Sequence, residues 1–404
     1  EKLSRKKPLL VLLIAVHLAV LALFKYAGFA ARSVNALVPD LLPVFAPALP
    51  LGISFYIFTA IGYLADVADG KVKAARSPFR FFVFLAFFGH GPSGPIVRYD
   101  QQLPYLDAKA AERQVSLDRF CYGIKRLVLG LAKKALIADQ LALIYARVTS
   151  VPAATLPAPA LVLGYLAYMM QLYFDFSGYS DMAIGIGSFF GLELPENFDY
   201  PYLARSIGEY WRRWHISLSG WFRDYVYIPL GGSRCSLAKN CRNLVIVFLL
   251  TGLWHGAAWQ YVAFGLLHGV LLCAERLGLR TLLDRAPRLL AHLYTVGVLW
   301  FTLIIFGAHG LAEGLAAWKG ILPGQSGARG YTLAAFADTK LLLLLAASLL
   351  LCGPVQAWFP RLKKALYAKT APGLAGMVGL LVLLFFSLMR VTAGTYSAFI
   401  YFQF

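Results

Sequence analysis

The chain has 404 residues, of which 59% are hydrophobic and only 14% are charged, and its formal net charge is +18 at pH 7. A soluble domain is nearer half apolar and a quarter charged, so this composition excludes a soluble protein and indicates an integral membrane protein. The basic residues gather in short clusters between apolar runs, which is the positive-inside pattern of membrane proteins. We therefore predict a lipid bilayer as a partner and no nucleic acid.

Apolar runs close to the roughly 20 residues needed to cross a bilayer recur along the whole chain. They cover residues 8–31, 41–65, 156–174, 243–273, 290–308, 341–355 and 373–391. With irregular and amphipathic pieces between them, they predict about ten membrane-embedded helices packed as one all-α domain over residues 1–404.

The positive-inside pattern also predicts which links face the cytoplasm. Basic clusters place there residues 2–7, 71–80, 109–134, 205–242, 276–288 and 361–369, whereas the weakly charged links 33–50, 150–159 and 310–338 would face outside. Two runs then lie between clusters on the same side. We expect residues 79–97, broken by glycines and prolines, to be re-entrant, and residues 243–275 to form a bent pair of helices with His255 near the bend.

Two glycine-bearing stretches near the middle of the chain have simpler interpretations. The polar stretch "GLELPENFDYPY" (residues 191–202) predicts a structured loop. "AIGIGSFFG" (residues 183–191) follows no predicted strand, so helix packing through small residues is favoured over phosphate binding.

The stretch "WRRWHISLSGWFRDY" (residues 211–225) concentrates charge and tryptophan inside a hydrophobic chain. On one helix, spacings of three and four residues would place Arg212, His215, Ser219 and Arg223 on one face and Trp211, Trp214, Leu218, Trp221 and Tyr225 on another. Such a helix lies at the membrane interface or lines a water-filled cavity. Composition alone favours the interfacial anchor.

Two further features favour a functional cavity. "YFDFSGYSD" places Asp175 and Asp181 directly after an apolar run, and carboxylates inside a membrane segment indicate function. His255 lies in an apolar segment between Gly252 and Gly256, which leave room for a substrate. A membrane-embedded histidine suits general-base catalysis on a hydroxyl, and nearby arginines suit an anionic donor. The other histidines outside these motifs, namely His17, His268, His292 and His309, are interpreted as packing residues.

Four motifs together resemble the membrane-bound O-acyltransferase (MBOAT) family, in its AlgI-like branch of bacterial polysaccharide O-acetyltransferases. They read "YFDFSGYSDMAIGIG", "PENFDYPYLARSIGEYWRRWHISLSGWFRDYVYIPLGG", "NLVIVFLLTGLWHGAAWQYVAFGLLHG" and the terminal "FIYFQF". One departure from the family pattern is "FFGHGPSGPI" with His90. The chain also begins later than many relatives, so we expect one or two N-terminal helices of a longer protein to precede Glu1.

The resemblance implies a polytopic helical bundle in which re-entrant and amphipathic helices surround a central tunnel, with a catalytic core at about residues 160–275. His255 matches the catalytic histidine of the family, and His215 matches its second characteristic histidine near the cytoplasmic mouth. The residues implied to line the tunnel are Asp175, Ser177, Tyr179, Asn197, Trp211, Arg212, Trp214, Ser219, Arg223 and Trp254.

The resemblance also implies the reaction. The enzyme would sit in the bacterial inner membrane and take an acyl group, with acetyl expected, from a cytoplasmic thioester such as acetyl-CoA. It would pass the group to a hydroxyl of an exported polysaccharide or to a periplasmic partner acyltransferase associated with the polysaccharide export or synthase machinery. No metal and no permanently bound cofactor are expected. Two alternatives stay open: D-alanyl or longer-acyl transfer from a carrier protein, and a proton-coupled transporter.

Overall fold

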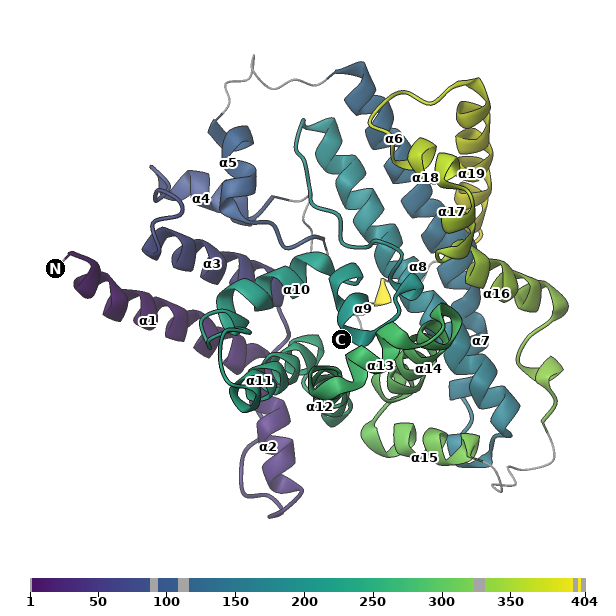
Figure 1. The fold of residues 1–404 in the computed structure, drawn as a ribbon, viewed down its shortest axis with the longest axis horizontal. Coiled ribbons are helices and arrows are strands. Elements are labelled where there is room, and N and C mark those ends of the chain that lie inside the picture. The colour runs from purple at the N-terminus through teal and green to yellow at the C-terminus, as the bar shows by residue number, and fades with distance from the viewer. Residues whose placement is uncertain (1, 88–93, 108–115, 323–330, 395–398, 401–404) are drawn as a thin grey trace.

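The computed structural model describes residues 2–87, 94–107, 116–322, 331–394 and 399–400, and the statements below concern these residues. They form helices and loops without a β-strand, apart from one isolated bridge between Phe198 and Trp214. The predicted all-α fold is therefore confirmed. Figure 1 shows the N-terminal helices on one side of the molecule. The long helix α8 (Ala158–Phe189) and its neighbours α6 (Leu117–Ala132) and α7 (Asp139–Thr149) lie on the other.

The first part of the chain is mostly helical up to α7. Its helices are α1 (Lys2–Leu21), the π-helix η1 (Ala22–Tyr26), α2 (Ala27–Asn35), α3 (Ile53–Ala68), α4 (Pro78–Leu85), α5 (Tyr99–Asp107), α6 (Leu117–Ala132), the π-helix η3 (Lys133–Ala138) and α7 (Asp139–Thr149). The middle part continues with the 3-10 helix η4 (Ala153–Thr155), α8 (Ala158–Phe189), the 3-10 helix η5 (Pro201–Leu203), α9 (Ile207–Arg213), α10 (Ile216–Phe222), the π-helix η6 (Arg223–Tyr227), α11 (Leu237–His255) and α12 (Trp259–Ala274).

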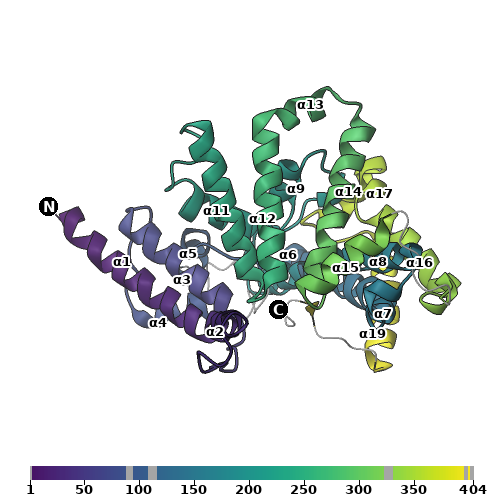
Figure 2. The same cartoon turned by 90° about the horizontal axis from the view of Figure 1, so that it is seen from below.

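The last part begins with the π-helix η7 (Glu275–Leu279), which continues α12. It then forms α13 (Arg280–Arg285), α14 (Arg288–Gly307), α15 (Leu311–Ile321), the 3-10 helix η8 (Leu333–Ala335), α16 (Thr339–Leu351), α17 (Pro354–Trp358), α18 (Pro360–Tyr367) and α19 (Leu374–Thr392). Figure 2 shows α11, α12 and α14 standing side by side.

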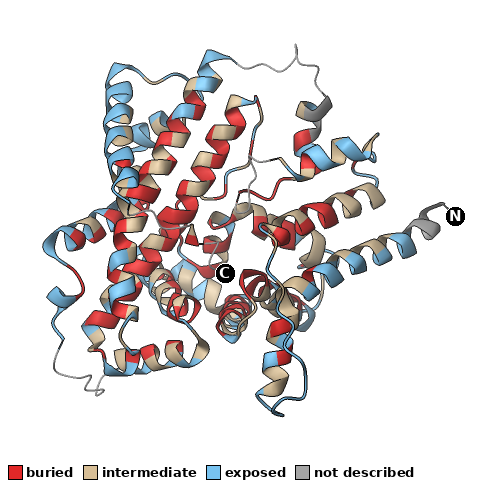
Figure 3. Cartoon of the chain, turned by 180° about the vertical axis from the view of Figure 1, so that it is seen from behind, coloured by how far each residue is buried: buried red, intermediate tan, exposed pale blue. Residues whose placement is uncertain are grey.

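Five helical segments in the described ranges are long and apolar enough to cross a membrane: Lys7–Asn35, Leu237–His255, Trp259–Arg285, Arg288–Gly307 and Leu374–Thr392. In the first and last of these spans, only 6% of the most apolar window is buried inside the protein, so most of their side chains are available to contact lipid. Figure 3 shows the same contrast, since buried residues concentrate in the inner helices and α1 is largely exposed. The protein is therefore a multi-pass membrane protein. The larger number of about ten embedded helices stays a prediction, because an embedded helix need not span.

Helix α8 forms the centre of the bundle, and most of its side chains are buried. Glycines let it approach α6 closely: a Cβ placed on Gly185 would lie 2.6 Å from the carbonyl oxygen of Gly123, and one on Gly178 would lie 2.8 Å from that of Gly130. The predicted role of the 183–191 stretch in helix packing is therefore confirmed at Gly185, as expected for small residues between membrane helices.

Two predicted apolar runs have different bounds in the structure. The run 41–65 is not one helix: residues 41–52 are non-helical, and α3 begins only at Ile53. Three prolines, at 43, 47 and 50, account for this, because each lacks a backbone N–H donor. The run 156–174 continues as helix to Phe189, since the polar residues after Phe174 find buried partners within the bundle.

The predicted single helix through residues 211–225 is wrong. Helix α9 ends at Arg213, His215 has a left-handed backbone with φ of 44°, and α10 begins at Ile216. Arg212, His215, Ser219 and Arg223 therefore do not share one helix face. Trp211, Trp214 and Trp221 are all buried in the protein, so they do not act as the interfacial anchors that composition alone favoured.

Other predictions have mixed outcomes. The bent pair at 243–275 is confirmed, since α11 and α12 meet at a short turn directly after His255. The polar stretch 191–202 is mostly loop, with only the short η5 beginning at Pro201, which agrees with the prediction. Helix α4 has only eight residues, but the middle of the predicted re-entrant segment, including His90, lies outside the described residues.

Candidate active site

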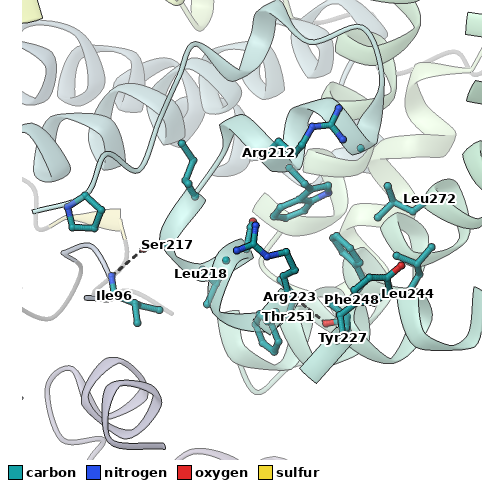
Figure 4. A pocket seen from close by; sticks show the side chains of 18 of the residues that line it. Ile96, Arg212, Ser217, Leu218, Arg223, Tyr227, Leu244, Phe248, Thr251 and Leu272 are labelled. Carbon is teal, nitrogen blue, oxygen red and sulfur yellow. Dashed lines mark hydrogen bonds between the residues drawn. The ribbon is translucent and has the colours of Figure 1, made fainter. Parts of the chain in front are cut away.

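A cavity of about 680 Å³ opens beside α9, α10 and η6 and extends to α11 and α12. Its wall includes Trp211, Arg212, Ser219 and Arg223 from the charged and aromatic stretch, together with Phe248 and Thr251 from α11. Figure 4 shows the side chains of Arg212 and Arg223 among those lining this space. Four of the residues predicted to line a tunnel thus line one cavity.

The break between α9 and α10 is held by Asn197, which is fully buried in the 191–202 loop. Its carbonyl oxygen accepts a hydrogen bond from Ile216 N at 3.0 Å. Its side-chain Oδ1 accepts from Ser217 N at 3.1 Å and from Ser217 Oγ at 2.7 Å. These contacts satisfy amide groups at the start of α10 that have no partner within the helix. Asn197 thus shapes the cavity wall through Ser217 and does not line it.

The two predicted catalytic histidines lie on either side of Trp254. The ring centroids of His215 and Trp254 are 5.5 Å apart, and those of Trp254 and His255 are 5.0 Å apart. His215 is fully buried and His255 is 5% exposed. Burial, with a smaller contribution from His255, lowers the pKa of His215 well below its ordinary value, so this imidazole is neutral near pH 7.

His255 lies just beyond the inner end of the cavity. Thr251, one helical turn earlier on α11, lines the cavity, whereas His255 does not. The four residues from Thr251 to His255 rise about 6 Å along the helix axis. The histidine packs against Phe306 of α14, with ring centroids 5.0 Å apart. A continuous tunnel past Trp254 stays a prediction.

A buried series of hydrogen bonds next to this site gives His268 a packing role, as predicted. Trp211 Nε1 donates to His268 Nδ1 at 3.0 Å, so that nitrogen carries no proton. His268 Nε2 lies 3.1 Å from Thr302 Oγ1, and the threonine hydroxyl donates to Leu299 O. The hydroxyl therefore accepts from a neutral imidazole protonated at Nε2. Both ring nitrogens of His268 therefore make hydrogen bonds, and these bonds orient Trp211 at the cavity wall.

The predicted residues of α8 lie away from the cavity. Asp175 Oδ1 is 2.7 Å from Lys134 Nζ, and its Oδ2 accepts from Ile400 N at 2.8 Å, while Lys134 also contacts Asp139 at 2.7 Å. Tyr179 packs edge-on against Phe399. These contacts give Asp175 and Tyr179 a place in the attachment of the C-terminal segment.

Ser177 lies near another group of charges on α8. It borders a small polar cleft together with Asp181 and Lys133, whose carboxylate and ammonium are 2.7 Å apart. Asp181 also pairs with the buried guanidinium of Arg126. Ser177 does not line the large cavity, so its predicted tunnel-lining role stays a prediction.

Sequence reasoning missed two arginines of the cavity wall, Arg98 and Arg276. Arg98 pairs with Asp224, which also binds Arg223 through Nε at 2.6 Å. Arg276 lies in η7, directly after α12. Arg276 begins a predicted basic cluster and Arg98 lies between two of them, so no local motif distinguished either residue.

The comparisons with known proteins decide the family. The model of the membrane-bound O-acyltransferase family, MBOAT, matches residues 53–315. The chain belongs to the membrane-bound O-acyltransferase family. Its matched region contains the whole cavity wall, both histidines and Trp254, and it begins with α3. Membership identifies this MBOAT protein as an acyltransferase.

Curated relatives agree with this family assignment. The chain is 37% identical to the probable alginate O-acetylase AlgI of Azotobacter vinelandii, over 97% of this chain and 84% of that protein. It is 43% identical to the probable alginate O-acetylase AlgI of Pseudomonas aeruginosa, over 74% of this chain and 56% of that protein. It is 35% identical to the peptidoglycan O-acetyltransferase of Helicobacter pylori, over 78% and 65% respectively.

Proposed function

We propose that this MBOAT protein transfers an acetyl group from a cytoplasmic thioester to a hydroxyl on the other side of the membrane. The acceptor is an exported polysaccharide or a periplasmic partner acyltransferase, and the enzyme sits in the bacterial inner membrane. The observation that carries this proposal is the position of His255, one helical turn beyond an arginine-lined cavity. Its support includes relatives named as O-acetylating enzymes of alginate and peptidoglycan.

The chemistry requires one base. A neutral His255 imidazole accepts the proton of the acceptor hydroxyl while that oxygen attacks the thioester carbonyl carbon. The new C–O bond forms, the C–S bond breaks, and the thiolate leaves and takes up the proton. The products are an ester and a free thiol, so no oxidant, metal or permanently bound cofactor is needed. His215 lies across Trp254 from His255 and would hold the inner end of the donor path.

The cavity has the charge that an anionic donor requires. Arg98 and Arg223 share Asp224, so part of their charge is already compensated. Within the ranges that the structure describes, Arg212 and Arg276 make no ion pair with a carboxylate, although both line the cavity. Guanidinium groups bind phosphates with two parallel hydrogen bonds. Acetyl-CoA, which carries phosphates at one end and the thioester at the other, fits this arrangement.

A carrier-protein donor is the second candidate. The chain is 34% identical to the teichoic acid D-alanyltransferase of Bacillus subtilis over 55% of this chain and 58% of that protein. A D-alanyl or longer acyl group would arrive on a phosphate-bearing arm of a carrier protein. The same arginines would then bind the phosphate of that arm.

The test uses protein in proteoliposomes, with radiolabelled acetyl-CoA supplied on the face that bears the basic loops. We expect label on an acceptor or on the protein with wild type, and a loss of at least about a hundredfold with His255→Ala, as for removal of a general base. His309→Ala is the matched control, because His309 is exposed outside the bundle. Full activity of a folded His255→Ala variant contradicts the proposal.

The donor is tested with Arg212→Ala and Arg276→Ala. Each is expected to raise the KM for acetyl-CoA by about tenfold, the value of one charge-assisted hydrogen bond. Arg361→Ala on exposed α18 serves as the control and should leave KM unchanged. Label transferred only from an acyl or D-alanyl carrier protein would replace acetyl-CoA by the second candidate donor.

A further inference from the structure

Lys25 is a cation inside a candidate membrane span, with apolar residues on both sides of it. The span Lys7–Asn35 has 29 residues, and Lys25 lies ten residues before its end. The next cation, Arg32, follows seven residues later, about 10 Å along the helix. A lysine inside a membrane span costs several kcal/mol unless it finds a partner inside the protein. An intramembrane lysine therefore indicates a function, and its partner identifies which one.

The partner of Lys25 is the end of the helix that carries His255. Lys25 Nζ donates to the carbonyl oxygen of Trp254, and it lies 3.3 Å from Ser54 Oγ. The neighbouring Tyr26 donates its hydroxyl to Leu253 O at 2.8 Å. Carbonyl groups in the last turn of an α-helix have no intrahelical partner. Lys25 and Tyr26 thus cap the two carbonyls that immediately precede His255.

This double contact lies at the end of the π-helix η1. On a regular α-helix, consecutive side chains point about 100° apart, so two neighbours rarely reach one target. Here Lys25 and Tyr26 end the π-helical turn Ala22–Tyr26 and reach consecutive carbonyls of one partner helix. π-helical turns inside α-helices are frequent at functional sites. Further along, Phe29 packs edge-on against Trp259, at the start of α12. The α1–α2 segment therefore holds the α11–α12 turn at both ends.

The charge of Lys25 is suited to this place. The C-terminus of a helix carries a partial negative charge, which a cation stabilises. No described carboxylate pairs with Lys25, so the helix end is its counter-charge. The ammonium also lies close to the ring of Trp254, at 5.9 Å from the centroid, and this ring separates the two histidines. A single side chain thus contacts both the backbone before His255 and the ring beside it.

We propose that Lys25 is a positioning residue for the acyl-transfer site: its ammonium, with the hydroxyl of Tyr26, fixes the last turn of α11 and so sets the orientation of His255. This inference rests on the proposed function, because it assumes that His255 acts on the substrate. Lys25 does not line the cavity, so it acts through the helix end and not on the donor.

The experiment measures kcat and the KM for acetyl-CoA in the proteoliposome assay for Lys25→Met, Lys25→Arg and Tyr26→Phe. Lys25→Met is expected to lower kcat by tenfold to a hundredfold, as a small misplacement of a catalytic group does, with KM for the donor within about twofold of wild type. Lys25→Arg keeps the cation and should restore most of kcat. Tyr26→Phe should lower kcat less than Lys25→Met. Lys319→Met, which removes an exposed lysine on α15, is the control.

Unchanged kcat in folded Lys25→Met overturns the inference, and so does a loss explained wholly by a smaller folded fraction. If Lys25→Met does not yield folded protein, Tyr26→Phe decides in its place, because it keeps the charge and the ring and removes one cap. A wild-type kcat for Tyr26→Phe then overturns the proposal. His255→Ala is run in parallel: its activity would refute the proposed function, whereas an inactive His255→Ala beside a fully active Lys25→Met refutes this inference alone.

Discussion

The contact between α11 and α12 sets where His255 lies, and it depends on Gly252. A Cβ placed on Gly252 would overlap the carbonyl oxygen of Tyr261, and it would lie 3.1 Å from that carbonyl carbon and 3.2 Å from Gly265 Cα. Carbon atoms pack at about 3.5–4.0 Å, and all three neighbours are backbone atoms that cannot rotate away. Gly252→Ala therefore forces the two helices apart by several tenths of an ångström.

The size of this effect follows from two opposing contributions. Overpacking of a well-packed interior costs about 1–3 kcal/mol, and the backbone obstacle places this case at the upper end. Alanine in a helix is favoured over glycine by about 1 kcal/mol. Gly297→Ala in α14 makes the same chemical change where a Cβ would meet nothing within 4 Å, so it keeps only the favourable contribution. The helix-propensity gain is common to both variants and cancels, so they should differ by the overpacking cost alone, about 1–3 kcal/mol in the free energy of unfolding and towards the upper end of that range.

Both variants are compared by thermal unfolding in detergent and by the acyl-transfer assay. We expect Gly252→Ala to unfold at a lower temperature than wild type and to lose kcat, because His255 follows three residues later on the displaced helix. Gly297→Ala should match or exceed the stability of wild type. Equal unfolding temperatures and equal kcat for the two variants would refute the idea that close contact at Gly252 places the histidine.

Three further predictions concern buried polar contacts. Lys134→Met leaves the carboxylates of Asp139 and Asp175 without their shared cation. It should lower the free energy of unfolding in detergent by about 3–5 kcal/mol. Lys340→Met, which removes an exposed lysine of α16, should not lower it. Trp221→Phe removes the donor to Phe58 O and should cost about 1–3 kcal/mol, more than Trp318→Phe, whose similar bond to Phe301 O is exposed. Burial raises the pKa of Asp224, but hydrogen bonds from Arg223 and Arg98 outweigh it and lower that pKa below its ordinary value. The stabilisation that the Asp224 carboxylate provides is therefore present above the ordinary carboxyl pKa and is lost as the pH falls through the lowered value. Asp224→Asn should therefore make the free energy of unfolding depend less on pH in the acid range.

The features that sequence predicted well are local. The bent pair α11 and α12 follows from one apolar run interrupted by glycines, and the bend falls at His255 because Gly256 follows it directly. This prediction needs only neighbours within a few residues.

The break at His215 could not be predicted, because its cause lies 18 residues earlier in the chain. Helical spacing of Arg212, His215, Ser219 and Arg223 is consistent with one helix, and nothing in that stretch ends it. The left-handed residue is held by Asn197, whose backbone and side-chain oxygens replace the hydrogen bonds of a continuous helix. The charged and buried residues then separate, since Arg212 lines the cavity and His215 enters the core.

The buried ion pairs show the same limit of prediction from sequence, because their partners are distant along the chain. Asp175 attracted attention as an intramembrane carboxylate, yet its cation, Lys134, is supplied by a helix far away in sequence. Arg126 and Asp181 form a second internal pair of this kind. Such charges are compensated within the protein and hold helices together.

A different set of cations makes no ion pair with a carboxylate among the described residues, although Glu275 lies near Arg212 and interacts with it electrostatically. Lys25 donates to a carbonyl in the last turn of α11, and Arg212 and Arg276 line the cavity together with residues of that helix. Lys25 is half-buried, and such a cation is expensive to keep without a counter-charge, so its place indicates where negative charge is expected. For Lys25 that charge is the carbonyl end of α11. Arg212 and Arg276 are exposed at the cavity, where the proposed donor would supply negative charge. Lys25 contacts the carbonyl of Trp254, directly before His255, and the cavity that Arg212 and Arg276 line reaches Thr251, one turn earlier on α11. The proposed base would thus lie between the helix end that Lys25 holds and the cavity proposed for the anionic donor.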